Sequence, residues 1–289
     1  MMIDALIVTF NPEIERFTFA LKSLESQVSE IIIVDNGSKN YDEIEKVKTK
    51  NSVLIPLNDN FGNAYAVNRG FEYAEKQGVD FIILSDQDTV FNADYAANFE
   101  KVFEEKHDEK IAAYAPIVFD ENINNTLYVG VLKSNRIKNV VPEKAMSVFQ
   151  TIASGMVIDC KIFQKAGGMN EDIFVDMFDY EWCWKVNYLG YKVLVSPKLS
   201  INHKFGDKII NVLGKQLPLR SDLRYYYGIR NAIALSLTTK YLPKKGRFFL
   251  FVFGIEYFCG YFFLAKKKLL LLKAVIDGLK KKTGKLIIS

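Results

Sequence analysis

Two aspartates at the end of a short apolar run are the first residues whose spacing suggests chemistry. Asp86-Gln87-Asp88 directly follows Phe81–Leu84, four large apolar residues in a row. Carboxylates at positions i and i+2 of a strand-end loop can reach the same hard cation, and Mg²⁺ prefers oxygen ligands completed by substrate phosphates. Paired acids are common in loops, so the informative feature is their position after a buried strand. We therefore predict that Asp86 and Asp88 bind Mn²⁺ or Mg²⁺.

A second group of acids lies among aromatic residues between Phe174 and Trp182. An acid in apolar surroundings holds its proton more tightly, which suits a general base. Asp179 and Glu181 are equally explained as acids in the first turn of a helix, where they interact favourably with the helix dipole. The spacing alone favours neither interpretation.

Two other segments contain groups that can bind a nucleotide. Asp35 precedes an Asn-Gly turn, and its carboxylate can accept a hydrogen bond from a nucleobase N–H while the turn redirects the chain. Asn60 and Gly62 open a helix, whose N-terminus favours anions, and Gly62 permits close approach of a ligand. Helix capping alone also explains the asparagine. Arg69 in the same helix would either neutralise a phosphate or be solvated.

The chain has two histidines. His107 stands in a charge-rich stretch typical of a solvated surface. His203 follows a strand-like segment and could bind metal or phosphate, although a lone histidine is more often structural.

Strands and helices alternate along the first hundred residues, which predicts a mostly parallel sheet flanked by helices. The predicted buried strands are Ile3–Phe10, Ile31–Val34, Ser52–Leu57 and Phe81–Leu84. Polar residues follow each of them, and ligands of open α/β sheets bind at the carboxyl ends of the strands. The four strand ends therefore predict one active-site edge.

The remainder of the chain is less regular, and residues 111–150 show no clear pattern. We expect strand character around Ser154-Gly155, a helix over 179–187, a strand over 191–195 and a helix over 220–241. We divide the chain into a catalytic domain, 1–240, and a helical tail, 241–289. The domain comprises a nucleotide-binding half, 1–110, and an acceptor-side half, 111–240.

The tail differs from the rest of the chain in charge and composition. Residues 240–289 hold 12 basic and 2 acidic residues, a net charge of +10, whereas 1–239 holds 26 and 32, a net charge of −6. Phe248–Ala265 is rich in aromatics, with one acid at Glu256, and Leu269–Leu279 has one apolar helical stripe. Basic, aromatic amphipathic helices lie in the plane of a membrane interface. We expect the tail to bind an anionic membrane surface; packing on the protein's own core or a homo-oligomer contact is the alternative.

Location and partners follow from the same features. The N-terminal Met1–Asp4 lacks the positive charge that begins a signal peptide. We therefore expect a cytoplasmic protein, peripheral at the inner face of the plasma membrane. The net charge is positive only in the tail, so we expect no nucleic-acid partner.

Taken in order, the motifs resemble those of glycosyltransferase family 2, and within it the bacterial rhamnosyltransferase group. The resemblance runs from Ile7 to about Asp207 and rests on Val8-Thr9-Phe10-Asn11-Pro12, Val34–Ser38, Asn60–Gly70, Ser85–Thr89, Ser154-Gly155, Phe174–Cys183 and His203–Asp207. The sequence departs from the pattern at two positions. Phe178 precedes Asp179 where many relatives have Glu, which leaves Asp176 as a second candidate base, and Lys185 stands where relatives often have Arg.

The resemblance implies a GT-A-type, Rossmann-like mixed sheet and a set of residue roles. Thr9, Asn11 and Asp35 would hold the nucleoside, and Asp86 would lie near the ribose or the metal. Asp88 would bind the metal that bridges the two phosphates. Asp179 would be the catalytic base, and His203 would approach the metal or the pyrophosphate. Further candidates are Asn60, Gly62, Asn68, Arg69, Arg224 and Arg230 for the donor, and Ser154, Gly155, Glu181 and Trp182 for the acceptor.

The implied reaction is inverting, metal-dependent sugar transfer from a nucleotide-diphosphate sugar to a lipid-linked or polysaccharide acceptor in cell-surface glycan synthesis. The resemblance favours dTDP-rhamnose, and UDP-galactofuranose or a UDP-hexose stays open. A nucleotidyltransferase usually needs a Gly-rich phosphate loop, whereas the first strand here ends in Thr9-Phe10-Asn11-Pro12. A non-catalytic membrane-associated binding module would not require acids at positions 86, 88 and 179.

Overall fold

The computed structural model describes residues 1–120, 125–203, 208–212 and 215–287. The centre of the fold is a mixed sheet of ten strands, whose main path runs β10-β12-β6-β11-β4-β1-β2-β3. Its parallel core comprises β1 (Ile3–Thr9), β2 (Ile31–Asp35), β3 (Ser52–Pro56) and β4 (Phe81–Ser85). These are the four strands that the apolar runs predict, within two residues at each end. Their carboxyl ends share one edge of the sheet.

The second half of the sheet is mixed in direction. The strand β11 (Val157–Asp159) runs antiparallel between β4 and β6 (Ile111–Asp120), and β12 (Lys192–His203) runs parallel to β6. Short strands complete this half: β5 (Val90–Phe91), β7 (Asn125–Thr126) and β10 (Met146–Val148). Two hairpins lie outside the sheet, β8 (Val129–Lys133) with β9 (Arg136–Val140), and β13 (Lys208–Val212) with β14 (Lys215–Leu219).

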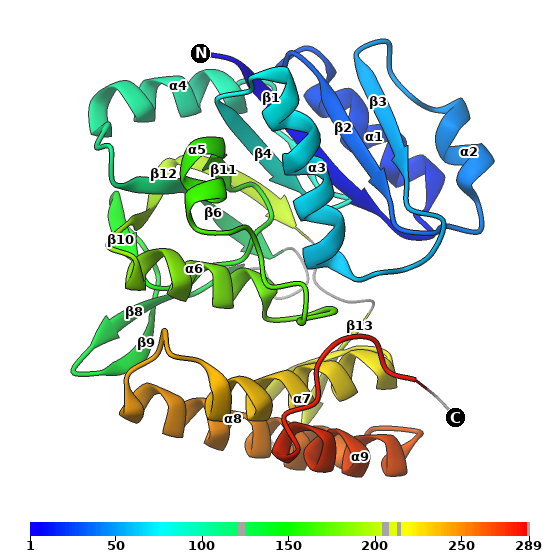
Figure 1. Cartoon of the computed structure of the whole chain (residues 1–289), viewed down its shortest axis with the longest axis vertical. Helices are drawn as coiled ribbons and strands as arrows, with labels where there is room; N and C mark the ends of the chain where they lie inside the picture. The colour runs from blue at the N-terminus through cyan, green and yellow to red at the C-terminus, as the bar shows by residue number, and fades with distance from the viewer. Residues whose placement is uncertain (121–124, 204–207, 213–214, 288–289) are drawn as a thin grey trace.

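Helices cover both faces of the sheet (Figure 1). One face packs against α3 (Asn63–Gln77), α5 (Cys160–Lys165) and α6 (Phe178–Tyr188). The other packs against α1 (Ile14–Glu25), α2 (Tyr41–Lys46) and α4 (Tyr95–Lys106). Because side chains alternate along a strand, Leu6 faces the first layer and Ile7 the second. The predicted GT-A-like order of strands and helices is therefore present as a mixed sheet with flanking helices.

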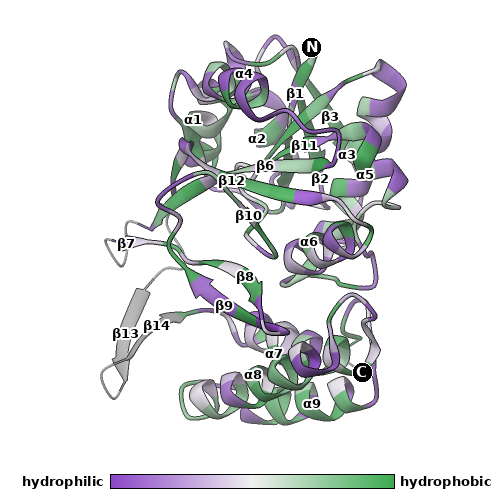
Figure 2. Ribbon diagram, turned by 90° about the vertical axis from the view of Figure 1, so that its left-hand side faces the viewer, coloured by the Kyte–Doolittle hydropathy of each residue, from purple (hydrophilic) through white to green (hydrophobic). Residues whose placement is uncertain are grey.

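Three further helices form a separate layer at one end of the molecule (Figures 1 and 2). α7 (Asp222–Thr238) lies next to the sheet domain, and α8 (Lys244–Phe262) and α9 (Lys268–Leu279) pack on it from outside. The hydroxyl of Tyr226 donates to buried Asp277 of α9 at 2.8 Å. The layer thus begins at α7, earlier than the division at residue 240. No helix in the described part of the chain has the length and apolar character that crossing a membrane would require.

After α9 the chain returns to the sheet domain as a strap, residues 283–286. The Gly284 N–H donates to the carbonyl of Asp172 at 2.7 Å, and the Leu286 N–H donates to the Tyr227 hydroxyl at 2.8 Å. The ammonium group of Lys285 pairs with Asp59 at 3.0 Å. The strap therefore joins the helical layer to the loop that follows β3.

Candidate active site

The loop after β4 is fixed from both sides. The Phe10 N–H at the end of β1 donates to Gln87 Oε1 at 2.9 Å. The hydroxyls of Thr89 and Ser154 share a hydrogen bond of 2.9 Å. Asp88 lies between these two anchors and Asp86 directly before the first, and both aspartate side chains are exposed at the strand end. The sheet therefore presents two carboxylates on a well-supported loop.

The acid at the end of β2 is buried and held by its neighbours. Asp35 accepts hydrogen bonds from the Thr9 hydroxyl at 2.9 Å and from the Ser38 N–H at 3.0 Å, and both acid and threonine are almost fully buried. The Asn11 N–H donates to the Ser38 hydroxyl, and Asn11 Oδ1 accepts from the Lys39 N–H. Three of the predicted nucleoside-binding residues, Thr9, Asn11 and Asp35, therefore lie together at the ends of β1 and β2.

The loop before α3 lies against the segment that precedes α6. Asn60 Oδ1 accepts from the Asn36 side chain at 3.2 Å and from the Gly62 N–H at 3.0 Å. Gly62 has φ +94°, and a Cβ there would lie 2.4 Å from the Phe174 carbonyl oxygen. The Asn63 N–H donates to the same carbonyl at 2.8 Å. Glycine is therefore required both by the backbone conformation and by this close approach.

Asp179 lies in the first turn of α6 with its side chain partly buried. Its Oδ1 accepts from the Tyr180 N–H at 2.8 Å and its Oδ2 from the Ala153 N–H at 3.3 Å. Burial raises the pKa of Asp179, the two backbone hydrogen bonds lower it, and the negative charges of Asp176 and Asp86 raise it, which brings the pKa to about 7. Ala153, which donates to Asp179, adjoins Ser154, whose hydroxyl meets that of Thr89, so the acid on α6 lies near the loop after β4.

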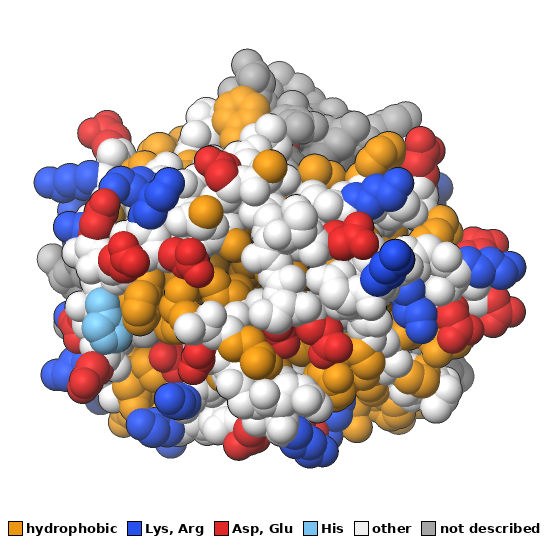
Figure 3. All heavy atoms as spheres, turned by 90° about the horizontal axis from the view of Figure 1, so that it is seen from above, with side chains coloured by type: hydrophobic (Ala, Val, Ile, Leu, Met, Phe, Trp, Pro, Cys, Tyr) orange, Lys and Arg blue, Asp and Glu red, His pale blue; other side chains and the backbone are white. Residues whose placement is uncertain are grey.

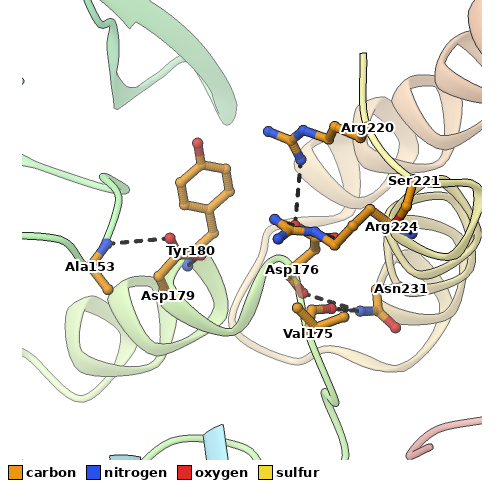
Figure 4. Close-up of polar contacts among 9 residues, drawn as sticks. All are labelled: Ala153, Val175, Asp176, Asp179, Tyr180, Arg220, Ser221, Arg224 and Asn231. Atoms are coloured by element: carbon orange, nitrogen blue, oxygen red, sulfur yellow. Dashed lines mark hydrogen bonds and ion pairs between the residues drawn. The ribbon is translucent and has the colours of Figure 1, made fainter. Parts of the chain in front are cut away.

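Asp176 is in a different electrostatic setting (Figure 4). Arg224 of α7 donates to its two carboxylate oxygens at 2.9 and 2.5 Å, and Arg220 contributes a longer contact of 3.4 Å. Asp176 and Met177 both have positive φ, 60° and 69°, which is uncommon for residues with a side chain. The Asn231 amide donates to the carbonyl oxygens of Val175 and Asp176 and supports this turn.

The two acids three residues apart therefore differ in what they can do. The oxygens of Asp176 already accept hydrogen bonds from two guanidinium groups, so protein donors occupy both of them. Asp179 is held by backbone N–H groups, and a pKa near 7 suits a general base at neutral pH. Of the two predicted bases, the geometry supports Asp179.

The structure does not bring all four predicted acceptor-binding residues to this edge. Trp182 is fully buried, and its ring centroid lies 5.8 Å from that of Phe163. Ser154 is 3% exposed, and its hydroxyl shares a hydrogen bond with that of Thr89. Gly155 is held by the hydrogen bond from its N–H to the Leu84 carbonyl. Glu181 is buried on the other side of α6, where it lines a cavity of about 420 Å³ with Lys185. These residues shape the site from behind, because consecutive helix positions point in different directions.

Three of the predicted donor-binding residues also have other partners. Asn68 hydrogen-bonds to Met169 and to Glu171, and Arg69 pairs with Glu171 at 3.0 Å. Arg230 is 1% exposed, lies 4.8 Å from the ring centroid of Tyr227, and donates to the Gly284 carbonyl. Arg230 therefore belongs to the packing of the helical layer on the strap. The expectation that it binds the donor is wrong for this arrangement.

His203 ends β12 in register with Asp120, and its side chain lies outside the described part of the structure. Its predicted metal or pyrophosphate contact therefore stays a prediction.

Sequence reasoning missed supporting residues that act through backbone groups. One of them is Ala153, whose N–H donates to Asp179. Because the donor is a backbone group, no pattern of side-chain types in the sequence indicates it. Gln87, the middle residue of the Asp-Gln-Asp motif, ties the loop after β4 to β1. Arg220 was predicted only as the first residue of a helix over 220–241, and the structure places it before α7 and beside Asp176.

The carboxylates at the edge fit a hard divalent cation. Among the described residues there is no group of three or more His, Cys, Asp or Glu side chains that could hold a metal by themselves. Mg²⁺ is commonly bound through one or two carboxylates, with the remaining positions filled by substrate phosphates and water. Asp86 and Asp88 supply that number of oxygen ligands, so metal binding together with a diphosphate is chemically consistent with this loop.

Residues 4–165, more than half of the chain, match the model of glycosyl transferase family 2. The chain belongs to this family. It is accordingly a glycosyltransferase, as the motifs predict. The match covers β1 to α5 and so includes the loops that present Asp35, Asp86 and Asp88.

The similarity extends beyond the family region. The chain is 28% identical over 295 residues to dTDP-rhamnosyl transferase RfbF of Shigella flexneri, covering 98% of this chain and 97% of that protein. Among solved structures, S. aureus TarS 1-349 in complex with UDP-GlcNAc is similar with a TM-score of 0.61 and 15% identity over 97% of this chain and 81% of that one. GalNAc-T7 with UDP, GalNAc and Mn²⁺ gives a TM-score of 0.59 and 14% identity. That match covers 89% of this chain and 55% of the GalNAc-T7 chain. At these identities the structures show a shared fold.

Proposed function

We propose that the protein transfers L-rhamnose from dTDP-rhamnose to a hydroxyl group of a lipid-linked or polysaccharide acceptor, with inversion at the anomeric carbon. The choice of donor is supported by the similarity to the S. flexneri dTDP-rhamnosyl transferase along nearly the whole chain. The observation that carries the chemistry is Asp179, a partly buried carboxyl group whose pKa is raised to about 7 beside Asp86. This is the protonation behaviour that a general base needs.

In the proposed reaction the acceptor oxygen attacks the anomeric carbon from the side opposite the nucleotide. The bond from that carbon to the phosphate oxygen breaks, and its electron pair leaves with the nucleoside diphosphate. Asp179 takes the proton of the attacking hydroxyl as the new bond forms. The Ala153 and Tyr180 N–H groups hold the carboxylate in one orientation during the transfer.

Binding of the donor is divided between the two ends of the site. Asp35, oriented by the Thr9 hydroxyl, is proposed to accept from the nucleobase, and Asn60 and Gly62 shape the adjacent loop. Arg224 is half-exposed despite its contact with Asp176 and is proposed to reach the diphosphate together with Arg220. Asp176 is then a positioning residue, which fixes both guanidinium groups in place.

Asp88 and Asp86 are proposed to hold Mg²⁺ or Mn²⁺ at the diphosphate. When bound, the cation would neutralise charge on the departing nucleoside diphosphate.

The proposal is tested by offering the full-length protein several donors in the presence of Mn²⁺ or Mg²⁺. A donor that binds only the folded state raises the melting temperature. We expect dTDP-rhamnose to raise it, and UDP-galactofuranose, UDP-glucose and UDP-galactose to have little effect. We also expect slow release of dTDP from dTDP-rhamnose. Asp179→Asn should keep the thermal shift and lose the release of nucleotide.

Two results would contradict the proposal at different levels. A shift with a UDP-sugar and none with dTDP-rhamnose would refute the donor and keep the enzyme class. Unchanged nucleotide release in Asp179→Asn would refute the role of the base.

A further inference from the structure

The outermost helices present apolar side chains to solvent. On α8, Phe248 and Phe263 are 62% and 81% exposed, and on α9, Leu269 and Ile276 are 80% and 51% exposed. The opposite faces of the same helices are buried against α7, as Leu271 shows. Packing on the protein's own core therefore accounts for the inner faces of both helices and leaves the outer faces without a partner in this chain.

The two helices that carry these side chains are in contact with each other. α8 and α9 lie side by side on the far side of α7 from the sheet (Figures 1 and 2). We call their outward apolar residues the outer face: Phe248, Phe263, Leu269, Leu272, Ile276 and Leu279. A grouped apolar surface of this kind marks an interaction site, whereas single exposed apolar residues need no explanation.

Positive charge borders the outer face. Lysines begin α8 at Lys244 and Lys245, lie at the junction with α9 at Lys266–Lys268, and follow α9 at Lys280–Lys282. Of the two acids in the tail, Asp277 is buried and paired with Lys273 and Lys282. The other end of the molecule looks different, because basic and acidic side chains are interspersed over it (Figure 3).

We propose that the outer face rests on the surface of an anionic lipid bilayer. Apolar side chains would enter the boundary between headgroups and acyl chains, and the surrounding lysines would contact lipid phosphates. A second copy of the chain is the competing occupant. Two outer faces meeting each other would bring together two tails of net charge +10, which repel. Charge complementarity therefore favours lipid over self-association.

The depth of insertion is shallow. Glu256 is exposed and lies on the outward side of α8, two turns from both Phe248 and Phe263. A carboxylate is costly in hydrocarbon, so this side of α8 stays at the level of the headgroups. The same conclusion follows from the lack of a helix that could span a bilayer in the described part of the chain.

The inner side of α8 reaches the active site. The ring of Tyr257 packs over α7, where a Cβ at Gly228 would lie 3.0 Å from it. The Tyr257 ring also contacts the ring of Tyr225, whose hydroxyl accepts from the Arg220 N–H at 2.8 Å, so Tyr257 lies near the residues that hold Asp176. The bilayer would therefore lie one helix away from the catalytic edge. If the acceptor is lipid-linked, which rests on the proposed function, the same bilayer would deliver it.

The test is flotation of the full-length protein with phosphatidylcholine vesicles that contain or lack phosphatidylglycerol. We expect binding to the anionic vesicles, and partial release at high salt. Replacing Lys266, Lys267 and Lys268 by Gln should weaken binding by roughly two orders of magnitude, at about fivefold per lysine. Phe263→Ser with Leu269→Ser should also weaken it, because both side chains are exposed and the fold does not depend on them.

Matched controls separate the outer face from general effects of charge and apolarity. Exposed lysines elsewhere, Lys22, Lys76 and Lys101, replaced by Gln should leave binding nearly unchanged, as should Phe19→Ser on α1. Equal binding by all variants, or no binding to anionic vesicles, would overturn the proposal. So would a dimer that the Phe263→Ser, Leu269→Ser variant converts to a monomer without change in vesicle binding. The thermal shift with dTDP-rhamnose, measured on the same variants, reports the proposed function separately.

Discussion

Arg224 holds both carboxylate oxygens of Asp176, at 2.5 and 2.9 Å, three residues before Asp179. This contact crosses from the helical layer to the sheet domain, because Arg224 belongs to α7 and Asp176 precedes α6. It separates two acids that the sequence leaves equivalent. Asp176 is paired with two arginines, whereas Asp179 is held by backbone N–H groups and has a pKa raised to about 7.

The first prediction distinguishes these two acids kinetically. Asp179→Asn should lower kcat by about 10²- to 10⁴-fold with little change in donor KM, since it removes the base and leaves the donor contacts. Asp176→Asn should mainly raise donor KM, by roughly 10- to 100-fold, because the arginines lose a charged partner that fixes them. Steady-state kinetics on both variants check this. The reverse pattern, with Asp176→Asn the variant that loses kcat, would transfer the role of base to Asp176.

The second prediction concerns the pH dependence of the reaction. Asp179 must be deprotonated to act as a base, and its pKa is raised to about 7. We therefore expect kcat/KM to rise with pH and to reach half of its plateau near pH 7. Donor binding, followed by thermal shift across the same range, serves as the control. An activity that stays flat from pH 5.5 to roughly pH 8 is incompatible with this group as the base.

The third prediction concerns how the raised pKa of Asp179 makes the stability of the wild type, compared with Asp179→Asn, depend on pH. Below about pH 4 the carboxyl is protonated in both the folded and the unfolded chain, and its burial has no ionic cost. As pH rises toward 7 the unfolded chain loses this proton before the folded protein does, so the wild type loses stability in that interval. Asparagine is neutral throughout. Asp179→Asn should therefore melt at a higher temperature than the wild type, by a few degrees above pH 7 and by little at pH 4.

Calorimetry or circular dichroism melts at several pH values measure this difference. Asp35→Asn is a useful comparison, because Asp35 is buried and accepts hydrogen bonds from both Thr9 and Ser38. That substitution should destabilise the protein. A constant difference between Asp179→Asn and wild type at all pH values would show that the shift has another origin.

The fourth prediction addresses the metal. Asp88→Asn should abolish metal-stimulated transfer and remove the effect of Mn²⁺ on donor binding, since one of two carboxylate ligands is lost. The melting temperature without metal should change little, because Asp88 is exposed. Titration of Mn²⁺ into the protein with the nucleoside diphosphate provides a direct readout. Wild-type affinity for the ion in that variant would remove Asp88 from the site.

The fifth prediction tests the contact between the donor loop and the segment before α6. Gly62→Ala should destabilise the protein and weaken donor binding, because the new methyl group would lie 2.4 Å from the Phe174 carbonyl oxygen. Gly78→Ala is the matched control. Gly78 also has positive φ, +73°, but has open space around it. It therefore reports the backbone strain alone, of order 1 kcal/mol. Equal losses in the two variants would mean that the contact with Phe174 contributes nothing.

The parallel half of the sheet could be predicted because buried parallel strands are continuous apolar runs. Helix α3, Asn63–Gln77, begins directly after Gly62, as the sequence predicts, and Gly78 follows its last residue. β6 escaped prediction because its alanines and Pro116 have weak strand propensity, and its pairing with β12 comes from 80 residues away. Such long-range partners leave no local pattern.

The site was predictable where a residue type has few other uses and less so where direction matters. Type and position single out Asp86 and Asp88, whereas Asp179 was singled out by the family resemblance, and the roles of all three stay predictions. Arg230 has the composition and spacing of a donor-binding residue, but its side chain points into the helical layer. Which side of a helix faces the substrate depends on what packs against it. The contact of Arg220 and Arg224 with Asp176 likewise depends on where α7 packs. Long-range contacts set that position, and no local sequence pattern indicates it.

The strap, residues 283–286, couples the stability of the helical layer to that of the sheet domain. Its backbone hydrogen bonds from Gly284 and Leu286 are sheltered contacts, whereas the exposed pair of Lys285 and Asp59 contributes little on its own. Together these contacts join the loop after β3 to the segment after α9, although the two are more than 200 residues apart in the sequence. Such non-local closure slows folding and joins otherwise separable layers into one cooperative unit. Loosening of the helical layer would therefore disturb the nucleotide loop, although the two are separated by most of the polypeptide.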